Sequence, residues 1–451
     1  MTILPATSLS RSGDGFGLRL VAAVAAAGLG ALAFESPRRA VEALMAAALV
    51  FLAFSRLAWA VAIFVLLTFP ENLPGVLGTG ATVAKPVGFV LALGWAGYAA
   101  ARRGQLTLLP RDHPTLFWIV LAFLLLATAS LLWASDSAQT VYQLKRLAQV
   151  VLLLFVAYTA ASSRRSFRLI VWAFLFASVV TSIYSIASGS YIAGDRLGGL
   201  FDPNYYAAEL IPAIVTATFL LLTARQARMR LFMLTVIGVD LTAFALTQSR
   251  GGIIGLVVAA LTAVVVAGRA RPRVVIGVLL FAAAAATYLL VFTPSHLKSA
   301  TSSSGRSDEW RIALRMMHDH PLQGVGLGNY QVVEPSYAQS NIDLHYVKFV
   351  VRDRLVAHNS YLELSAELGI VGGLLFVSIL ATALRSGVLA MRRLEQQHDE
   401  LEWFARGIVA GAVGMFTAYF FLSAQYEKQL WLVVALLAVL PVLSRHPSLD
   451  G

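Results

Sequence analysis

Arginine residues beside apolar segments are the first candidates for chemistry in this sequence. Arg196 lies in a stretch rich in Gly, Gly194 to Asn204, which ends in Asp202-Pro203-Asn204 and leads into an apolar run. Glycines and a proline at this density let backbone approach a ligand closely. Two readings remain open: Arg196 binds an anion, or it pairs with Asp195 or Asp202 in an ordinary turn.

Arg250 occupies a very tight turn between two apolar runs, within Gln248-Ser249-Arg250-Gly251-Gly252. A guanidinium group presents a planar fork of donors that suits phosphate oxygens. A single arginine at a membrane interface can equally extend its side chain to lipid headgroups. Both readings stay open for Arg250.

The residues from Ser307 to His320 have the pattern of an amphipathic helix. Ser307 is a plausible N-cap, Asp308 and Glu309 follow in the first turn, and Pro321 comes after the end. The helix is expected to have an apolar face and a basic face, formed respectively by Trp310, Leu314 and Met317 and by Arg311, Arg315 and His318. The basic face suits either lipid phosphates at a membrane surface or a substrate clamp. Arg306, just before the helix, is the better candidate for holding a phosphate.

A second helix start follows at Ala357-His358-Asn359-Ser360-Tyr361-Leu362-Glu363, where Ser360 and Glu363 have the spacing of a capping box. His358 then stands just outside the helix N-terminus. The positive end of the helix dipole disfavours imidazolium there, so the ring should stay neutral and able to accept a proton. A structural role for this lone histidine is the alternative.

Three other polar features of the sequence are not predicted to be catalytic or binding sites. Gly324-Val325-Gly326-Leu327-Gly328-Asn329 lacks the flanking strand and helix of a nucleotide-binding loop and is expected to be a flexible hairpin. His318 and His320 diverge on a helix, so a helix C-terminus is favoured over a metal site. Asp240 lies inside an apolar run without an evident partner in the sequence, and it receives no predicted role.

The composition indicates the class of protein that holds these residues in place. Of 451 residues, 58% are hydrophobic and only 13% are charged, and the mean hydropathy of +0.73 excludes a soluble globular protein. The net charge of +11 is read as a sign of membrane orientation, so nucleic acid is not an expected partner. The absence of cysteine excludes disulfides, thiolate metal sites and a cysteine nucleophile.

The predicted fold class is all-α, a polytopic transmembrane helix bundle of about twelve spans, within a range of twelve to fourteen. The apolar runs long enough to cross a membrane lie at about 18–34, 39–55, 85–100, 115–133, 147–161, 168–187, 205–223, 231–247, 251–267, 274–293, 359–384, 406–423 and 430–444, and a shorter run lies at 57–69. Sixteen Lys and Arg fall in one alternating set of loops and five or six in the other, which predicts that both termini are cytoplasmic. Residues 1–293 and 359–451 are the predicted transmembrane parts, and 294–358 form one large periplasmic loop containing helices. No repeat or pair of matching halves is visible.

Taken together, four motifs over residues 190–380 resemble the O-antigen ligase and polymerase superfamily: the Arg196 segment, the Ser249-Arg250-Gly251-Gly252 turn, Pro321 with the glycine-rich segment, and the His358-Asn359-Ser360 start. The resemblance implies a bacterial inner-membrane glycosyltransferase that takes its glycan from undecaprenyl pyrophosphate at the periplasmic face, without a metal, a cofactor or a nucleotide sugar. It implies that Arg196, Arg250, either Arg306 or Arg311, and His358 occupy functional positions. Because negative charge develops on a departing pyrophosphate, we expect the arginines to hold it, with Arg306 preferred over Arg311.

His358 is then the expected general base, with Arg196 and Arg250 also counted as catalytic. Asn359, Glu363, Asp202 and Asn204 are the expected supporting residues. The favoured reaction is transfer of O-antigen to lipid A-core in a membrane-lipid environment, because the moderate length and single dominant loop resemble a ligase. The alternatives are an O-antigen polymerase or a protein O-oligosaccharyltransferase of the same superfamily, and a lipid-linked glycan transporter of another class.

Overall fold

The structure, a computed structural model, describes residues 48, 50–69, 84–101, 108–189, 191–192, 196–198, 202–279, 306–340 and 355–445. The longer helices that make up the bundle are α6 (Pro114–Ala129), α7 (Ser137–Ala160), α8 (Arg164–Ser188), α9 (Pro203–Thr223), α10 (Ala227–Thr247), α11 (Arg250–Val266), α17 (Ser360–Gln396), α18 (Leu401–Ala418) and α19 (Lys428–Arg445). The shorter elements are α3 (Leu57–Thr68), α4 (Ala84–Ala101), α5 (Leu109–Asp112), α14 (Arg306–Asp319), α15 (Tyr330–Gln339), η1 (Ser130–Leu132), η2 (Gly268–Ala270) and η3 (Tyr419–Phe421). Strands β1 (Tyr191–Ile192) and β2 (Arg196–Leu197) form one antiparallel pair.

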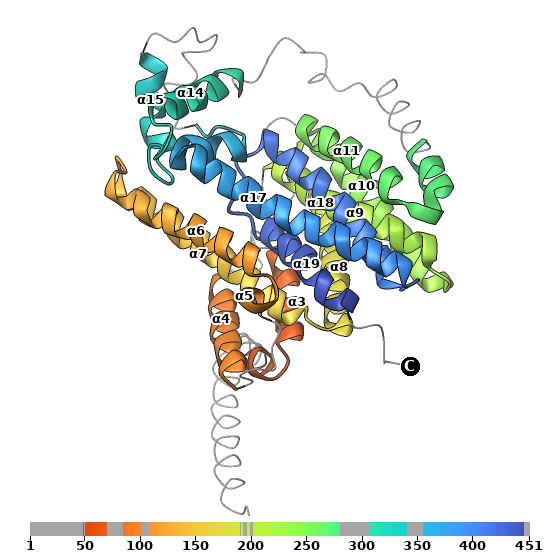
Figure 1. Ribbon diagram of the computed structural model, residues 1–451. Helices are drawn as coiled ribbons and strands as arrows, with labels where there is room; N and C mark the ends of the chain where they lie inside the picture. The colour runs from red at the N-terminus through yellow and green to blue at the C-terminus, as the bar shows by residue number, and fades with distance from the viewer. Residues whose placement is uncertain are drawn as a thin grey trace, which may run out of the picture.

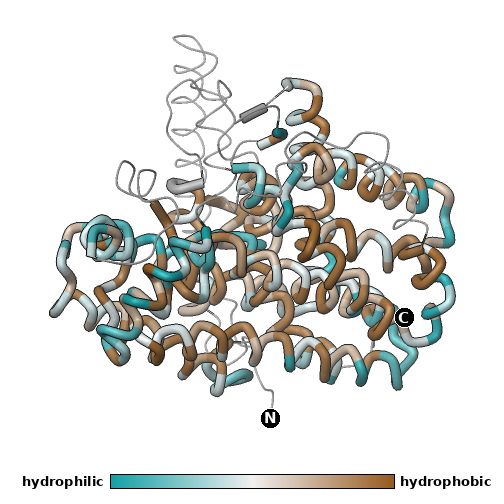
Figure 2. The backbone as a smooth tube through the Cα atoms, turned by 90° about the horizontal axis from the view of Figure 1, so that it is seen from above, coloured by the Kyte–Doolittle hydropathy of each residue, from teal (hydrophilic) through white to brown (hydrophobic). Residues whose placement is uncertain are grey.

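Eight helices in the described part of the chain are long and apolar enough to cross a membrane. A ninth span is obtained if α11 and the residues after it, which meet at 108°, are counted as one broken span. Figure 2 shows hydrophobic residues along the middle of the helices and hydrophilic residues toward their ends. The all-α polytopic class is therefore confirmed, whereas the described residues do not test the count of twelve. The predicted segment 18–34 and most of 39–55 and 274–293 lie outside the described residues.

The connections between helices gather at two opposite ends of the bundle. At one end, Trp133 Nε1 donates to Gln323 O over 2.9 Å, and Ser360 Oγ donates to Leu422 O over 2.6 Å. This end also carries α14 and α15, which lie beyond the start of α17 in Figure 1. These are the loops that the charge count predicts to be periplasmic, and we call this the loop end.

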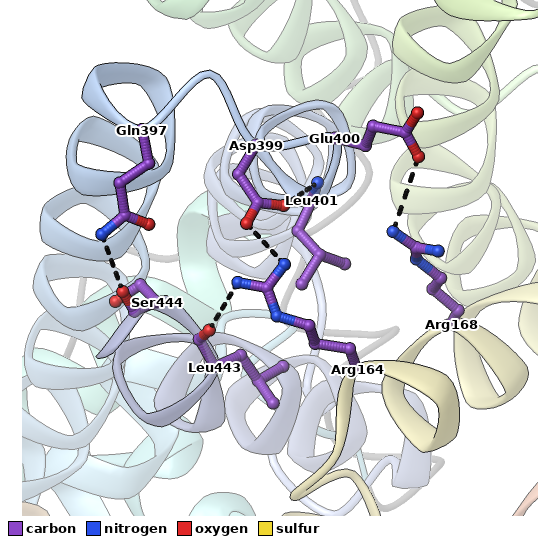
Figure 3. A network of polar contacts seen from close by, with 8 residues as sticks. All are labelled: Arg164, Arg168, Gln397, Asp399, Glu400, Leu401, Leu443 and Ser444. Carbon is purple, nitrogen blue, oxygen red and sulfur yellow. Dashed lines mark hydrogen bonds and ion pairs between the residues drawn. The ribbon is translucent and has the colours of Figure 1, made fainter. Parts of the chain in front are cut away.

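The opposite end is rich in arginine and is held by ion pairs (Figure 3). Arg164 Nη1 lies 2.5 Å from Asp399 Oδ2, and its Nη2 donates to Leu443 O over 3.1 Å. Arg406 is buried and pairs with the carboxylates of Glu395 and Glu402 at 2.8 and 2.9 Å. These contacts join the beginning of α8 to the α17–α18 turn and the end of α19.

The centre of the bundle is formed by α9, α11 and α18, which approach each other through glycine. A Cβ at Gly411 of α18 would lie 2.6 Å from Pro212 Cα of α9, and one at Gly255 of α11 would lie 2.7 Å from Gly414 O. Backbones this close leave no room for side chains between them. Gly251 and Gly252 of α11 are confined in the same way, so the glycines beside Arg250 fix the position of that helix start.

A break in α17 anchors the glycine-rich segment 324–329. Gly369 has φ 72° and ψ 178°, which interrupts the helix and frees the preceding carbonyl groups. Val325 N donates to Ala366 O over 3.0 Å, and Gly326 N donates to Glu367 O over 2.8 Å. All residues from Gly324 to Tyr330 are buried. The prediction of a flexible hairpin is therefore wrong, because this segment is hydrogen-bonded to a broken membrane helix.

Candidate functional site

Arg196 is held at the loop end by contacts to two helix termini. It lies on β2, paired with Ile192 of β1. Its Nε donates to Thr247 O, at the end of α10, over 2.9 Å, and its Nη2 donates to Asn204 Oδ1, in the first turn of α9, over 2.9 Å. These hydrogen bonds fix the guanidinium plane. Asp202 also attracts the guanidinium group, so the contacts agree both with an anion site and with a structural turn.

Asn204 joins the three helix ends around Arg196. Its Oδ1 also accepts from Ser249 Oγ over 2.9 Å, and its Nδ2 donates to Asp202 Oδ1 over 2.8 Å. Asp202 caps α9 by accepting from Asn204 N, and Ser249 caps α11 by accepting from Gly252 N. Both supporting residues predicted here, Asp202 and Asn204, thus position Arg196 and the start of α11, whose first residue is Arg250.

Arg306 lies near enough to Arg196 and Arg250 to interact with them electrostatically. Burial lowers the pKa of Arg306, and the positive charges of Arg196 and Arg250 lower it further. Burial likewise lowers the pKa of Arg196, with a smaller contribution from Arg250. Asp202 acts in the opposite direction on both. Three arginines therefore interact with one another in one partly buried region, where Asp202 opposes the charges of Arg196 and Arg306, and a bound anion would relieve their mutual repulsion.

Arg311 lies elsewhere. Its side chain is 47% exposed and its Nη1 is 3.6 Å from Asp308 Oδ1, one turn earlier in α14. Arg315 and His318 are exposed on the same side, so the basic face of this helix agrees with the prediction. The geometry favours Arg306 over Arg311 as the third arginine.

The N-cap predicted for α14 is wrong. The helix begins at Arg306, so Ser307 lies in the first turn and is not the N-cap. The buried face, which the sequence did not indicate, is formed by Asp308, Glu309, Ile312, Ala313 and Met316. Leu314 is 46% exposed. The helix packs against α15 and α17, and it turns two acidic side chains inward.

His358 lies directly before α17, as predicted, and is half-buried. Its φ of 49° is in the left-handed region, where histidine occurs more readily than most residues. Burial lowers its pKa, Arg306 lowers it further, and Asp202 partly opposes this. The lowered pKa favours the neutral imidazole, which is able to accept a proton.

The capping box predicted at Ser360 and Glu363 is wrong. Asn359 is the N-cap, and its Oδ1 accepts from Tyr361 N and Leu362 N, each over 3.0 Å. Ser360 instead donates to Leu422 O and accepts from Ala424 N, which ties α17 to the loop after α18. An asparagine caps a helix as well as a serine does, so the sequence allowed both registers.

Glu363 still reaches back across the helix start. Its Oε2 accepts from Ala357 N over 3.0 Å and from Ser423 Oγ, and its Oε1 accepts from Gln425 Nε2 over 2.9 Å. The carboxylate thereby fixes the backbone on the residue before His358. Asn359 and Glu363, the other two predicted supporting residues, act together to set the conformation at His358.

A buried acidic cluster in the loop was not predicted. Tyr330 Oη donates to Glu309 Oε2 over 2.9 Å, and Glu334 is fully buried. Burial raises the pKa of Glu309 to about 7 and that of Glu334 to about 8. The only sequence signal was the placement of acidic residues in two amphipathic segments, which normally indicates exposure.

Asp240 also finds partners that the sequence did not reveal. Its two carboxylate oxygens accept from Ser178 Oγ and Ser182 Oγ of α8 over 2.7 and 2.8 Å. The pattern of serines four residues apart on a facing helix satisfies the carboxylate inside the bundle. Asp240 thus links α8 to α10.

Comparison with known families gives one match. Residues 235–377 match the family model described as O-Antigen ligase, and this range contains Arg250, Arg306 and His358. Arg196, Asp202 and Asn204 precede the matched range. No curated protein matches the chain. The matched residues include most of the site and the broken helix that anchors its loop, so this part of the chain is similar to the O-antigen ligase family.

Proposed function

We propose that this protein transfers O-antigen polysaccharide from undecaprenyl pyrophosphate to lipid A-core at the periplasmic face of the bacterial inner membrane. The observation that carries the proposal is the interaction of Arg196, Arg250 and Arg306 with one another, together with the lowered pKa of His358 beside Arg306. A glycosyl transfer from a pyrophosphate requires a site for a polyanion and a group that accepts a proton. The three arginines would supply the first and His358 the second.

The three arginines would hold the pyrophosphate of the donor. Cleavage of the bond from the anomeric carbon to the pyrophosphate oxygen leaves the electron pair on the leaving group, so negative charge grows there. Guanidinium groups already fixed by protein contacts, as Arg196 is by Thr247 O and Asn204 Oδ1, stabilise that charge without reorganising. Each such donor contributes roughly 10²- to 10³-fold to the rate in comparable sites.

His358 would activate the acceptor. A ring nitrogen takes the proton from the acceptor sugar hydroxyl while the oxygen attacks the anomeric carbon, and undecaprenyl pyrophosphate departs. One displacement of this kind inverts the anomeric configuration. The fixed conformation at His358, set by the Asn359 cap and the Glu363 carboxylate, serves to aim the ring.

The first test is a gel of lipopolysaccharide, with a parallel assay of undecaprenyl-linked glycan, from a host lacking this gene. A ligase predicts loss of capped lipopolysaccharide together with accumulation of lipid-linked polymer. Core capped with single repeats and no lipid-linked polymer would identify a polymerase instead. An unchanged pattern would overturn the proposal in favour of protein glycosylation, another polysaccharide or transport.

The second test addresses the base. His358→Ala should lower turnover by about 10²- to 10⁴-fold, the usual contribution of general base catalysis. His318→Ala is the matched control, because His318 is 78% exposed at the end of α14 and should leave turnover unchanged. If His358→Ala retains full turnover, the histidine is not the base, and electrostatic catalysis by the arginines remains.

A further inference from the structure

A large polar cavity lies at the end of the bundle opposite the candidate site. Its volume is about 1020 Å³, and it lies between the start of α3, the end of α4, the start of α8 and the α17–α18 turn. Ligand pockets commonly measure roughly 300–1,000 Å³, so this space suits a sizeable ligand. Nothing in the proposed reaction uses it.

Positive charge predominates in the cavity. Four arginines line it, Arg56, Arg164, Arg165 and Arg168, against two carboxylates. One carboxylate, Asp399, is occupied by Arg164 and by Leu401 N (Figure 3). The other, Glu400, is 83% exposed and lies 3.7 Å from Arg168, so solvent weakens that pair.

Several donors in the cavity remain available. Within the described parts of the chain, Arg56 and Arg165 form no side-chain hydrogen bond or ion pair. The Nε atoms of Arg164 and Arg168 are buried there without a hydrogen-bond partner. A group with several acceptor oxygens and a negative charge would satisfy these donors.

The same cavity has aromatic walls. Trp59, which is 47% exposed, Tyr98 and Trp172 line it, together with Leu57 and Leu169. Tryptophan and tyrosine concentrate where a membrane protein meets lipid headgroups. The lining therefore pairs phosphate-binding donors with surfaces suited to glycerol and the upper part of an acyl chain.

We infer that this cavity binds an anionic phospholipid, with its phosphate against the arginines at the start of α8 and its chains along the tryptophans. The face involved is the one that the excess of arginine predicts to be cytoplasmic, where anionic lipids attract basic residues. This inference does not depend on the proposed glycosyl transfer. A bound lipid would fix the start of α8 relative to α3 and the α17–α18 turn.

Native mass spectrometry of the purified full-length protein tests the inference. After exchange into a mild detergent, wild-type protein incubated with phosphatidylglycerol should retain one lipid, and the double variant Arg56→Gln/Arg165→Gln should lose it. Each basic residue near a membrane surface contributes about 1 kcal/mol to anionic lipid binding, so the pair should weaken binding on the order of 30-fold. Arg56→Lys/Arg165→Lys should retain most of the affinity.

Arg228→Gln/Arg271→Gln is the matched control. It removes the same charge from exposed positions at the same end of the bundle, outside the cavity, and should leave lipid retention unchanged. Equal loss in both double variants would overturn the inference, since binding would then reflect overall charge. Equal retention of phosphatidylcholine would overturn it as well. Displacement of phosphatidylglycerol by millimolar inorganic phosphate would show a site for free phosphate and not for a lipid.

Discussion

The two arginines of α14 provide the sharpest test of the site, because they share a helix and differ in surroundings. Arg306 is partly buried and interacts with Arg196, Arg250 and Asp202. Arg311, five residues later, is 47% exposed and pairs with Asp308 at 3.6 Å. Replacing either by glutamine removes one positive charge and keeps a polar side chain of moderate length. A difference between the two variants therefore reports where the arginine lies, because the change in charge is the same in both.

The two substitutions are expected to lower kcat/KM to very different extents. If Arg306 stabilises the departing pyrophosphate in a low-dielectric site, Arg306→Gln should lower kcat/KM by about 10²- to 10³-fold, or roughly 2.7–4 kcal/mol. Because Arg311 is 47% exposed and lies away from the other arginines, solvent screens its charge, and Arg311→Gln should change kcat/KM by less than about fivefold.

The assay uses purified protein, a lipid-linked glycan donor and an acceptor core, with initial rates measured across donor concentrations. Thermal melting of each variant checks that folding is intact. Comparable losses in the two variants, or a larger loss for Arg311→Gln, would refute the assignment of Arg306 to the pyrophosphate.

Three further predictions follow from the pKa shifts and from the glycines. Because burial and Arg306 lower the pKa of His358, the acid limb of the pH–rate profile should lie below pH 6.5; a limb at or above 6.5 would contradict the neutral-base assignment. Burial raises the pKa of Glu334 from 4.5 to about 8, so its stabilising contribution is full below pH 4.5 and is lost as pH rises through 8. Glu334→Gln should therefore raise the melting temperature, relative to wild type, more at pH 9 than at pH 5, and an equal effect at both would show that the carboxyl is not protonated in the fold. Gly324→Ala should lower stability by more than about 2 kcal/mol, because Gly324 has φ +65° and a Cβ would overlap the Glu367 carbonyl. Its control, Gly238→Ala in α10, meets no atom within 4 Å and should be neutral or stabilising by about 0.5–1 kcal/mol in the same melting experiment.

The membrane helices were the most predictable part of the fold. Long apolar runs are dictated by the thickness of the bilayer, so the segments predicted at 115–133 and 205–223 agree closely with Pro114–Leu132 and Pro203–Thr223. The apolar runs at 57–69 and 251–267 also agree with α3 (Leu57–Thr68) and α11 (Arg250–Val266). Hydropathy alone does not decide whether a short helix such as α3, or a bent pair such as the one that begins with α11, forms a complete span. That depends on the packing of neighbouring helices, which a local pattern does not contain.

The residues of the site were predictable in kind but not in their contacts. Arginines and a histidine at the ends of apolar runs are unusual enough to be recognised, and the structure brings Arg196, Arg250, Arg306 and His358 together. Which residue caps α17 was not decidable, because Asn359 and Ser360 are both good caps. Tertiary hydrogen bonds decided it, since Ser360 is used by Leu422 O and Ala424 N.

The hidden acidic residues explain why the loop was the hardest part to predict. An amphipathic pattern assumes that carboxylates face solvent, yet α14 buries Asp308 and Glu309 while exposing Leu314. Burial of Glu309 is tolerated because Tyr330 donates to it and because its raised pKa, about 7, favours the uncharged form. The same packing carries Arg306 to the start of α14, beside the other arginines, while Arg311 on the next turn remains outside. The inward turn of the acidic side chains is therefore what separates the two arginines, and it follows from contacts with α15 and α17 that no local pattern specifies.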